Sequence, residues 1–524
     1  MNSRLKWAGS GYPQRALVLF GPQETLSSYG AWYRVIVGGL AVIATLVASH
    51  GLWGFVADRS AGSCFRSATG CVHHADDGKS AARVTNGTGP ARTICRVESR
   101  ENRELAPTTG VGGDTGATVP GVWRSVPTMP WAWLAIGLIA SALFAGGVAL
   151  FSSDPRHRLW GQAAVGGYAL AALAVMAWRS RRTRGVDVAL AVMVCGAILF
   201  PLLWLIAHGY GEPEVGVVAT SARELIHDGT PYRSAQALAA TTDPNQYNPY
   251  LPLMAVFGVP QALLGRGLLT DPRVWFGAVF LATFAVALRI AGARDSVRWA
   301  LLLTASPIIS FELCVGGTDV PMVAFMCLGF ALLWRDQVTN PVPAALALGV
   351  ASSMKATAWP ALVVAFALLF VRDGQRVAWR FAAVAISVVI VIVGPFAVLR
   401  PGSLVKNTIL FPLGLASVKS QADSPLLGHV LAQTGVLGHT IVVFLLVGSG
   451  LAILVSLVVR PPRDVPAATI RLVAGLSAMF VLAPSTRFGY FIYPAALVLW
   501  LLVSQAGRKT LAPYPAPEVL ARPG

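Results

Sequence analysis

The sequence predicts an all-α polytopic membrane protein with about 12 to 14 transmembrane helices. Only 12% of its 524 residues are charged, whereas a soluble protein averages about 25%. The charges cluster between long apolar runs, and several runs reach the ~20 residues that cross a bilayer as a helix. Membrane β-barrels instead show alternating segments of ~10 residues. The lipid bilayer is therefore the first partner that the sequence implies.

The N-terminal zone, residues 1–130, is predicted to hold one helix and a long polar loop. The apolar run at about 33–56 is too long for a signal-peptide core, so we expect a retained helix. Residues 57–129 are rich in Gly, Thr, Arg and Ser and lack apolar periodicity, which predicts disorder. The cysteines and histidines of this loop lack the close pairing of metal ligands, so no metal site is predicted there.

Residues 131–187 are predicted to form two accessory transmembrane helices and a basic cytoplasmic loop. Apolar runs at 131–151 and 160–178 precede the cluster RSRRTR at 179–184, which the positive-inside rule places in the cytoplasm. The basic N-terminus also predicts an inside start, and three crossings would then put RSRRTR outside. The two markers conflict, and we give the denser cluster more weight. The net charge of +17 is explained by such loops, and no basic folded domain indicates nucleic-acid binding.

The third zone, residues 188–505, is predicted to be the membrane core, followed by a Pro-rich tail at 506–524. Its first helix spans about 188–208. Further apolar runs follow at about 250–265, 274–291, 299–315, 320–334, 342–371, 380–399, 436–459 and 468–503. Two of these runs are long enough for two short passes each. Their predicted interruptions lie at Lys355 to Pro360 and at PSTRFG, residues 484–489.

Two acids, Glu212 and Glu214, directly follow the first core helix in the segment GEPEVG. If RSRRTR is cytoplasmic, this segment lies outside. The residues after it, 215–227, predict a short amphipathic helix on the membrane surface. Its expected apolar face comprises Val217, Val218, Ser221, Leu225 and Ile226. Gly229 is placed to end this helix, and Pro231 prevents its continuation.

This arrangement resembles the membrane glycosyltransferases of the GT-C superfamily. The resembling pattern is an acid after a helix, an interfacial helix ending in D-G-T-P-Y, and Y-N-P-Y-L-P-L opening the next helix. The closest resemblance is to glycosyltransferase family 87, actinobacterial enzymes that use polyprenyl-phosphate sugars. That family has an Asp, a Gly and a Tyr at the spacing of Glu214, Gly229 and Tyr232. This chain departs from the pattern by carrying Glu in place of Asp, with a second Glu nearby.

Three later segments resemble family 87 segments in the same order. They are GGTDVP with Asp319, SSMKATAWP with Lys355, and PSTRFGYF with Arg487. The resemblance covers about residues 190–505 and implies a GT-C-like catalytic bundle with an interfacial helix in its first external loop. It also implies an inverting transfer of a hexose, with mannose expected, at the cytoplasmic (plasma) membrane. The implied donor is a polyprenyl-phosphate sugar, and the implied acceptor is a lipid-linked or cell-envelope glycan.

Transfer from a lipid phosphate requires a base for the acceptor hydroxyl and cations for the departing phosphate. The predicted catalytic residues are Glu214 and Glu212, as alternative bases. The predicted substrate-binding residues are Asp319, Lys355, Arg487, Tyr232, Tyr247 and Asn248. Lys355 and Arg487 suit the phosphate, and Asp319 suits acceptor hydroxyls or the orientation of a cation. A divalent cation stays open as a cofactor.

Each of these residues also has a structural explanation. The two glutamates can be solvated acids of a loop. Lys355 can be a snorkelling side chain near a helix end, and Asp319 can be the N-cap of a helix. Arg487 can be a cytoplasmic cation that follows the positive-inside rule, and the aromatic residues can be anchors at the membrane interface.

Two other functions stay open, namely a transporter or flippase of lipid-linked sugars and a non-catalytic membrane assembly protein. A transporter commonly shows internal repeats, and none is found in the sequence.

The parity of the runs poses a further constraint. Three apparent crossings separate Glu214 from Asp319, which would place them on opposite faces. If both belong to one site, one run between 250 and 315 does not cross the membrane.

Overall fold

The computed structural model describes residues 131–178, 182–335, 337–418 and 422–511. The predicted N-terminal helix and polar loop, residues 179–181 of the basic cluster and most of the Pro-rich tail lie outside the described residues. The described part is helical, and its only β-type pairing is an isolated parallel bridge between Asp423 and Thr486. The predicted all-α membrane fold is confirmed.

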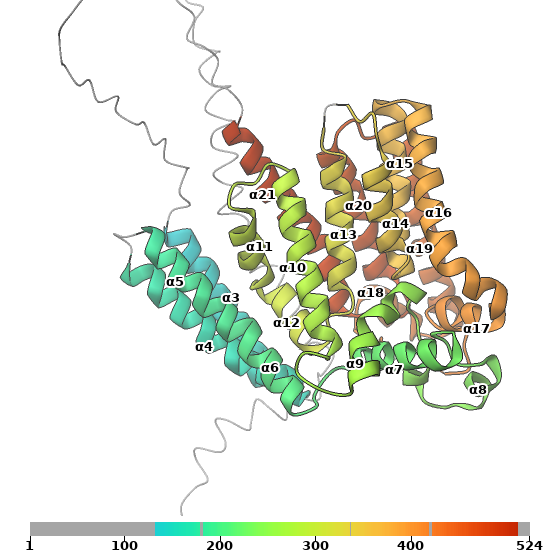
Figure 1. Cartoon of the computed structure of the whole chain (residues 1–524), viewed down its shortest axis with the longest axis horizontal. Helices are drawn as coiled ribbons and strands as arrows, with labels where there is room; N and C mark the ends of the chain where they lie inside the picture. Colours follow the sequence, from blue (N-terminus) through green and yellow to red (C-terminus); the bar gives the residue numbers. More distant parts are fainter. Residues whose placement is uncertain (1–130, 179–181, 336, 419–421, 512–524) are drawn as a thin grey trace, which may run out of the picture. The chain divides into compact units, whose positions relative to one another are not determined.

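Helices α3 to α21 follow one another with short connections (Figure 1). The α-helices are α3 (Trp131–Phe151), α4 (Pro155–Ala177), α5 (Arg182–Val194), α6 (Phe200–Ala207), α7 (Pro213–Asp228), α8 (Ala235–Ala240), α9 (Val259–Leu264), α10 (Pro272–Ile290), α11 (Ser296–Thr304), α12 (Pro307–Val315), α13 (Val320–Leu332), α14 (Val342–Ser352), α15 (Trp359–Arg372), α16 (Gln375–Leu399), α17 (Pro401–Val405), α18 (Leu427–Ala432), α19 (Val436–Val459), α20 (Val465–Leu482) and α21 (Ile492–Leu511). Short 3-10 segments are η2 (Pro244–Gln246), η3 (Pro252–Gly258), η4 (Ala356–Ala358) and η6 (Phe488–Phe491), and π-helical turns are η1 (Cys195–Leu199) and η5 (Lys406–Leu410).

By length and composition, eight described helices can cross a membrane, or nine if the bent pair α11–α12 counts as one span. The helices of that pair meet at an angle of 69°. Four shorter apolar helices are also present, at Pro252–Leu264, Val320–Leu332, Val342–Ser352 and Ala356–Arg372. The protein is therefore multi-pass, but the predicted total of 12 to 14 spans is not confirmed.

The run predicted at 250–265 does not form a long crossing helix. It consists of η3 and the single short helix α9, and both pack against α7. Helix α10 then leads away, and α11–α12 return, so that Val315 accepts a hydrogen bond from the backbone N–H of Glu212 at 2.8 Å. Since one outgoing and one returning segment separate them, Glu214 and Asp319 lie at the same end of the bundle. The parity constraint is satisfied in this way.

The predicted interruptions of the two long apolar runs are confirmed. The first run breaks into α14 and α15 around Lys355, and the second into α20 and α21 around Arg487. Both interruptions return the chain to the end that carries Glu212 and Glu214. The loops that could hold a site thus meet at one end of the helices, where α7, α8 and α9 also lie (Figure 1).

The π-helical turn η1 breaks the hydrogen-bond ladder between α5 and α6 beside α4 and α12. A π-turn changes the pattern of backbone bonds and is usually supported by neighbouring side chains. Here the carbonyl of Ala197 accepts from Trp160 Nε1 at 3.0 Å and from Cys314 Sγ at 3.5 Å. Gly167 and Gly196 also allow α4 to approach closely, since a Cβ at Gly196 would lie 2.6 Å from the Cα of Gly167. The accessory helix α4 is thereby packed into the core.

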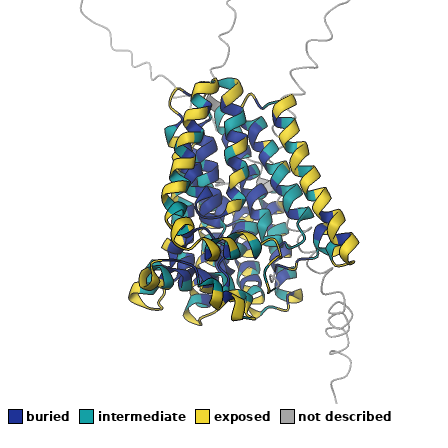
Figure 2. Ribbon diagram, turned by 90° about the vertical axis from the view of Figure 1, so that its right-hand side faces the viewer, coloured by how far each residue is buried: buried dark blue, intermediate teal, exposed yellow. Residues whose placement is uncertain are grey.

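Burial separates central helices from lipid-facing ones. Within an apolar 18-residue window of each span, 56% of the residues are buried in Phe488–Arg508, which includes most of α21, but only 6% in α16 and 11% in α19. Figure 2 shows exposed positions along the outer helices and buried positions between them. Because the exposed residues of α16 and α19 are mostly apolar, these helices present the surface expected to face lipid.

Candidate active site

Helix α7 carries the first two candidate residues at its start. Glu212 is the N-cap in extended conformation, and Glu214 lies in the first turn after Pro213, a residue suited to the N1 position. The helix ends at Gly229, whose φ of 68° is left-handed, as predicted. Its buried face comprises Val215, Val217, Val218, Ala219, Ser221 and Ala222. Ile226 was predicted on this face but is 44% exposed.

Arg487 bridges the two glutamates. Its Nη1 lies 2.5 Å from Glu214 Oε1 and 3.4 Å from Glu212 Oε2. The segment that carries Arg487 is held by its neighbour Thr486, whose backbone pairs with residues 422–424. The predicted base and the predicted phosphate cation therefore lie together, although 273 positions separate Glu214 from Arg487. Arg487 and the two acids therefore lie at the same end of the helices.

Glu212 has a second partner that the sequence analysis missed. His157 Nε2 lies 3.2 Å from Glu212 Oε1, and the imidazole packs edge-on against Phe311 at 4.9 Å between ring centroids. His157 lies on the first turn of α4. The accessory helices thus contribute directly to the carboxylate pair.

Lys355 and Asp319 form the second ion pair of the site. Lys355 Nζ lies 2.7 Å from Asp319 Oδ1, and the Tyr493 hydroxyl donates to the same oxygen at 2.8 Å. The ammonium lies over the rings of Tyr490 and Tyr250, at 4.6 and 5.4 Å from their centroids. Lys355 is only 8% exposed, so the snorkelling alternative is wrong. Asp319 stands at the N-cap of α13, but its side chain makes no capping bond.

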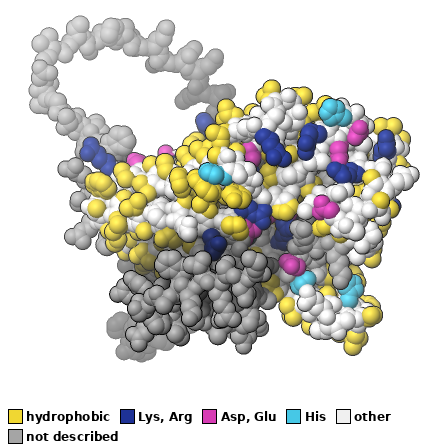
Figure 3. Space-filling view, turned by 90° about the horizontal axis from the view of Figure 1, so that it is seen from below, with side chains coloured by type: hydrophobic (Ala, Val, Ile, Leu, Met, Phe, Trp, Pro, Cys, Tyr) yellow, Lys and Arg dark blue, Asp and Glu magenta, His cyan; other side chains and the backbone are white. Residues whose placement is uncertain are grey.

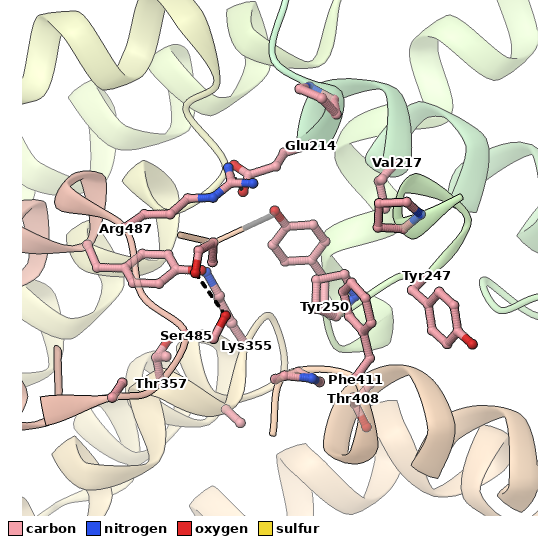
Figure 4. A pocket seen from close by; sticks show the side chains of 18 of the residues that line it. Glu214, Val217, Tyr247, Tyr250, Lys355, Thr357, Thr408, Phe411, Ser485 and Arg487 are labelled. Atoms are coloured by element: carbon pink, nitrogen blue, oxygen red, sulfur yellow. Dashed lines mark hydrogen bonds and ion pairs between the residues drawn. The ribbon is translucent and has the colours of Figure 1, made fainter. Parts of the chain in front are cut away.

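A pocket of about 220 Å³ opens between these ion pairs and an apolar wall (Figure 4). Its polar side includes Glu214, Lys355, Arg487 and Tyr490, and its apolar side includes Tyr247, Phe411, Met479 and Phe480. The Tyr247 and Phe411 rings stack at 4.6 Å. Four predicted site residues therefore line one cavity: Glu214, Tyr247, Lys355 and Arg487. Glu212 and Asp319 stand behind the wall, bound to the lining cations.

Tyr232 and Asn248 support the pocket from outside its wall. The Tyr232 hydroxyl donates to the Tyr250 carbonyl at 2.9 Å, and Asn248 Oδ1 accepts from the Tyr250 N–H at 3.1 Å. Asn248 also receives support from Asn407, whose Oδ1 accepts from the Asn248 N–H at 2.7 Å. Both residues fix Tyr250, which lines the pocket.

The two glutamates differ in their affinity for a proton. Burial alone would raise the pKa of Glu212, but the hydrogen bond with His157 and the charges of His157 and Arg487 lower it below its ordinary value. Burial raises the pKa of Glu214, and the neighbouring Arg487 opposes this only in part. Burial would lower the pKa of Lys355, but the charge of Asp319 outweighs this and the net shift is upward. Glu214 is thus the stronger base of the two.

Part of the chain that forms this site is similar in sequence to a known protein family. Residues 248–484 match the family model for glycosyltransferase family 87. The resemblance predicted from the sequence is confirmed over these residues. No curated protein matches the chain.

Two solved structures are similar to part of the chain. They are crystal structures of ArnT from Cupriavidus metallidurans, one in the apo state and one bound to undecaprenyl phosphate. Each shows 21% sequence identity, a TM-score of 0.37 and coverage of 57% of this chain. The chain matches little more than half of each ArnT structure, 55% and 56% of their lengths.

The family 87 segment contains Asp319 and Lys355 but not the whole site. Glu212 and Glu214 precede it, and Arg487 follows it. Residues that sequence reasoning did not assign to the site include His157, Tyr250, Tyr490 and Tyr493. The only sequence signal for His157 was a charged first turn in α4, which a positive-inside interpretation also explains.

A divalent cation finds no ready set of ligands here. Among the described residues, no three His, Cys, Asp or Glu side chains converge in a way that could hold a metal ion. The acids of the site are each bound to Arg487, His157 or Lys355 instead. The described side chains therefore do not fit a resident metal.

Proposed function

We propose that the protein is a membrane glycosyltransferase that moves a hexose from a polyprenyl-phosphate sugar to a lipid-linked or cell-envelope glycan. The supporting observation is the pocket that one carboxylate, Glu214, and two cations, Lys355 and Arg487, line together. Kinship of residues 248–484 with glycosyltransferase family 87 supports the reaction class. Mannose is the first sugar to test.

Glu214 acts in this proposal as the general base. The acceptor hydroxyl oxygen attacks the anomeric carbon, and its proton passes to the Glu214 carboxylate. The bond between the anomeric carbon and the phosphate oxygen breaks, and its electron pair leaves with the polyprenyl phosphate. This single displacement inverts the anomeric carbon. The raised pKa of Glu214 suits the role, because a stronger base accepts a proton more readily.

Arg487 and Lys355 stabilise the departing phosphate. Among the described residues, Arg487 contacts the two glutamates through Nη1 alone. The N–H groups of its Nε and Nη2 atoms can therefore bind oxygen atoms of a ligand in the pocket. Lys355 carries three N–H donors, and one binds Asp319. Preorganised cations of this kind lower the free energy of a transition state in which negative charge develops on the phosphate.

The charge distribution supports a site on the outer face of the plasma membrane. At the site end, described acids and bases are both frequent, and Figure 3 shows both signs scattered over the described part of that face. The opposite connections carry many more cations than acids, which the positive-inside rule assigns to the cytoplasm. These cations are Arg184, Arg289, Arg294, Arg298, Arg335, Arg372, Arg376, Arg380, Arg460, Arg463 and Arg508, against Asp187, Asp295, Asp373 and Asp464.

The clustering of charge argues against the transporter alternative. A transporter needs polar groups along a path between both faces. The pocket instead joins Glu214, Lys355 and Arg487 at one end of the helices. This arrangement favours chemistry at one membrane surface.

The test is transfer of labelled hexose from defined polyprenyl-phosphate donors to an acceptor glycolipid by the full chain in lipid nanodiscs. We expect Glu214→Gln to lower kcat by about 10²- to 10⁴-fold, the usual contribution of a general base. Glu212→Gln should lower it less, because Glu212 orients Arg487 and His157 and does not line the pocket.

Glu224→Gln is the matched control. Glu224 lies on the same helix but pairs with Arg233 at 2.9 Å, outside the pocket. Its variant should keep wild-type kcat. If Glu214→Gln and Glu212→Gln both remain fully active while folded, the assignment of the base is wrong. If the wild-type chain transfers no hexose from any donor, the proposed function fails.

A further inference from the structure

The tripeptide Asp-Pro-Arg occurs twice in the chain, at 154–156 and 271–273. Each copy opens a helix, α4 or α10, with Asp as the N-cap and Pro at the first position. In each copy the Asp side chain accepts from the backbone N–H of the Arg, at 2.8 and 3.0 Å. The two copies therefore have the same local structure, although they lie in different helices.

Both arginines fold back onto their own aspartate through the same atoms. Nε and Nη2 of Arg156 contact Asp154, and the equivalent atoms of Arg273 contact Asp271, at 2.5 to 3.0 Å for the closest pairs. Two parallel bonds fix the plane of each guanidinium. The third nitrogen, Nη1, is left to point in a defined direction.

The two Nη1 atoms donate hydrogen bonds to the backbone carbonyls of two consecutive residues in one loop. Arg273 Nη1 donates to the Tyr210 carbonyl at 2.8 Å, and Arg156 Nη1 donates to the Gly211 carbonyl at 2.6 Å. The next residue is Glu212. Arg273 Nη1 also donates to the Cys314 carbonyl at 3.0 Å, next to the Val315 carbonyl that accepts from the Glu212 N–H.

The surroundings leave this loop little freedom. Arg273 is 2% exposed, and a Cβ added at Gly211 would lie 3.4 Å from its Cζ. The loop is held by α4 on one side and by α10 and α12 on the other. Its backbone immediately precedes both carboxylates of the candidate site, so its position sets where they point.

We propose that Arg156 and Arg273 are positioning residues that clamp the backbone at residues 210–212 and so aim Glu212 and Glu214 at Arg487. One half of the clamp comes from α4, a helix outside the family 87 segment, and the other from α10 within it. The accessory helices are then part of the catalytic apparatus. The effect on transfer rests on the proposed function, but the clamp itself does not.

Hydrogen–deuterium exchange of the full chain in nanodiscs tests the clamp without any activity assay. The readout is the peptide that contains residues 208–214. In Arg156→Gln we expect the amides of 210–212 to exchange about 10-fold faster or more, because charge-assisted bonds are among the stronger ones. Arg158→Gln is the matched control, since Arg158 is exposed on the same helix turn. Its exchange should equal that of the wild type.

Kinetics then separate positioning from a general loss of structure. Arg156→Gln should lower kcat by about 10- to 100-fold with KM within about 2-fold, because misplacing a catalytic group by ~1 Å has an effect of this size. Arg156→Lys should recover part of kcat, since an ammonium reaches the Gly211 carbonyl but does not bind the aspartate in two places. Arg156→Lys also provides the test if Arg156→Gln does not fold.

Three results overturn the clamp: exchange in Arg156→Gln equal to that in Arg158→Gln, a raised KM with unchanged kcat, or no difference between the Lys and Gln variants. A wild-type chain without transferase activity would instead contradict the proposed function, and the exchange experiment would still decide the clamp.

Discussion

Replacing Lys355 by methionine removes the buried cation while keeping most of the side-chain length. Breaking a buried ion pair by removing one partner costs about 3–5 kcal/mol of the free energy of unfolding, because the other charge stays behind. Here the Tyr493 hydroxyl still donates to Asp319 at 2.8 Å, and the Asp319 side chain is 13% exposed. We therefore expect Lys355→Met to cost about 3 kcal/mol, the lower end of the range.

The reciprocal variant, Asp319→Asn, leaves the ammonium over the rings of Tyr490 and Tyr250. A desolvated cation–π contact is worth up to about 2 kcal/mol, so we expect a smaller cost of about 2 kcal/mol. The double variant carries no buried charge at this position. Its cost should stay near about 3 kcal/mol, which gives a coupling energy of about 2 kcal/mol between the two residues.

The assay is reversible denaturant unfolding of the four proteins in mixed micelles. Lys406→Met is the matched control, since within the described part of the chain Lys406 donates only to the Ala235 carbonyl, at 3.2 Å, and it should cost less than about 1 kcal/mol. If the costs of Lys355→Met and Asp319→Asn simply add, the two side chains do not form a coupled pair. That result would refute the reasoning from their 2.7 Å contact.

Two further outcomes follow from the site. Gly489→Ala should cost about 1–3 kcal/mol of unfolding free energy, because the added Cβ would lie 2.3 Å from Glu312 Oε1. Gly448→Ala is the control, since a Cβ there meets open space and should not destabilise the protein. Equal thermal stability of the two variants would contradict this expectation. Burial raises the pKa of Glu214, and only the deprotonated carboxylate can accept a proton. We therefore expect kcat/KM to fall as the pH decreases, with a midpoint above the ordinary glutamate pKa of about 4.3. A pH profile of kcat/KM that is flat down to that pH would contradict this expectation.

The local features of the fold were predictable from the sequence because their causes are local. Helix α7 follows from its apolar face, and its end follows from Gly229 and Pro231. The interruptions of the two long runs follow from a lysine, a proline and the polar segment PSTRFG. Which of the runs between 250 and 315 does not cross was not predictable, because the composition of 252–264 is that of a membrane helix and only packing against α7 distinguishes it.

The site was predictable as a set of residues but not as a set of contacts. Lys355 stands out because charge within apolar sequence is costly. Glu214 and Arg487 were selected through the resemblance to family 87 segments. Their pairing depends on which chain ends meet, and a pattern within a short window contains no such information. His157 and Arg156 were missed for the same reason. The repeated Asp-Pro-Arg tripeptide could have indicated Arg156, whereas His157 had only the charged first turn of α4 as a signal.

The distance along the chain between Glu214 and Arg487 has a consequence for biogenesis. Ribosomes add about 5–20 residues per second, so roughly 15 to 50 seconds pass between the synthesis of the two residues, which are 273 positions apart. His157 precedes Glu212 by only 55 positions and is present from the start. The nascent loop can therefore dock on the early hairpin first. The ion pair that joins the early and late parts of the site forms last, only after α20 has been inserted.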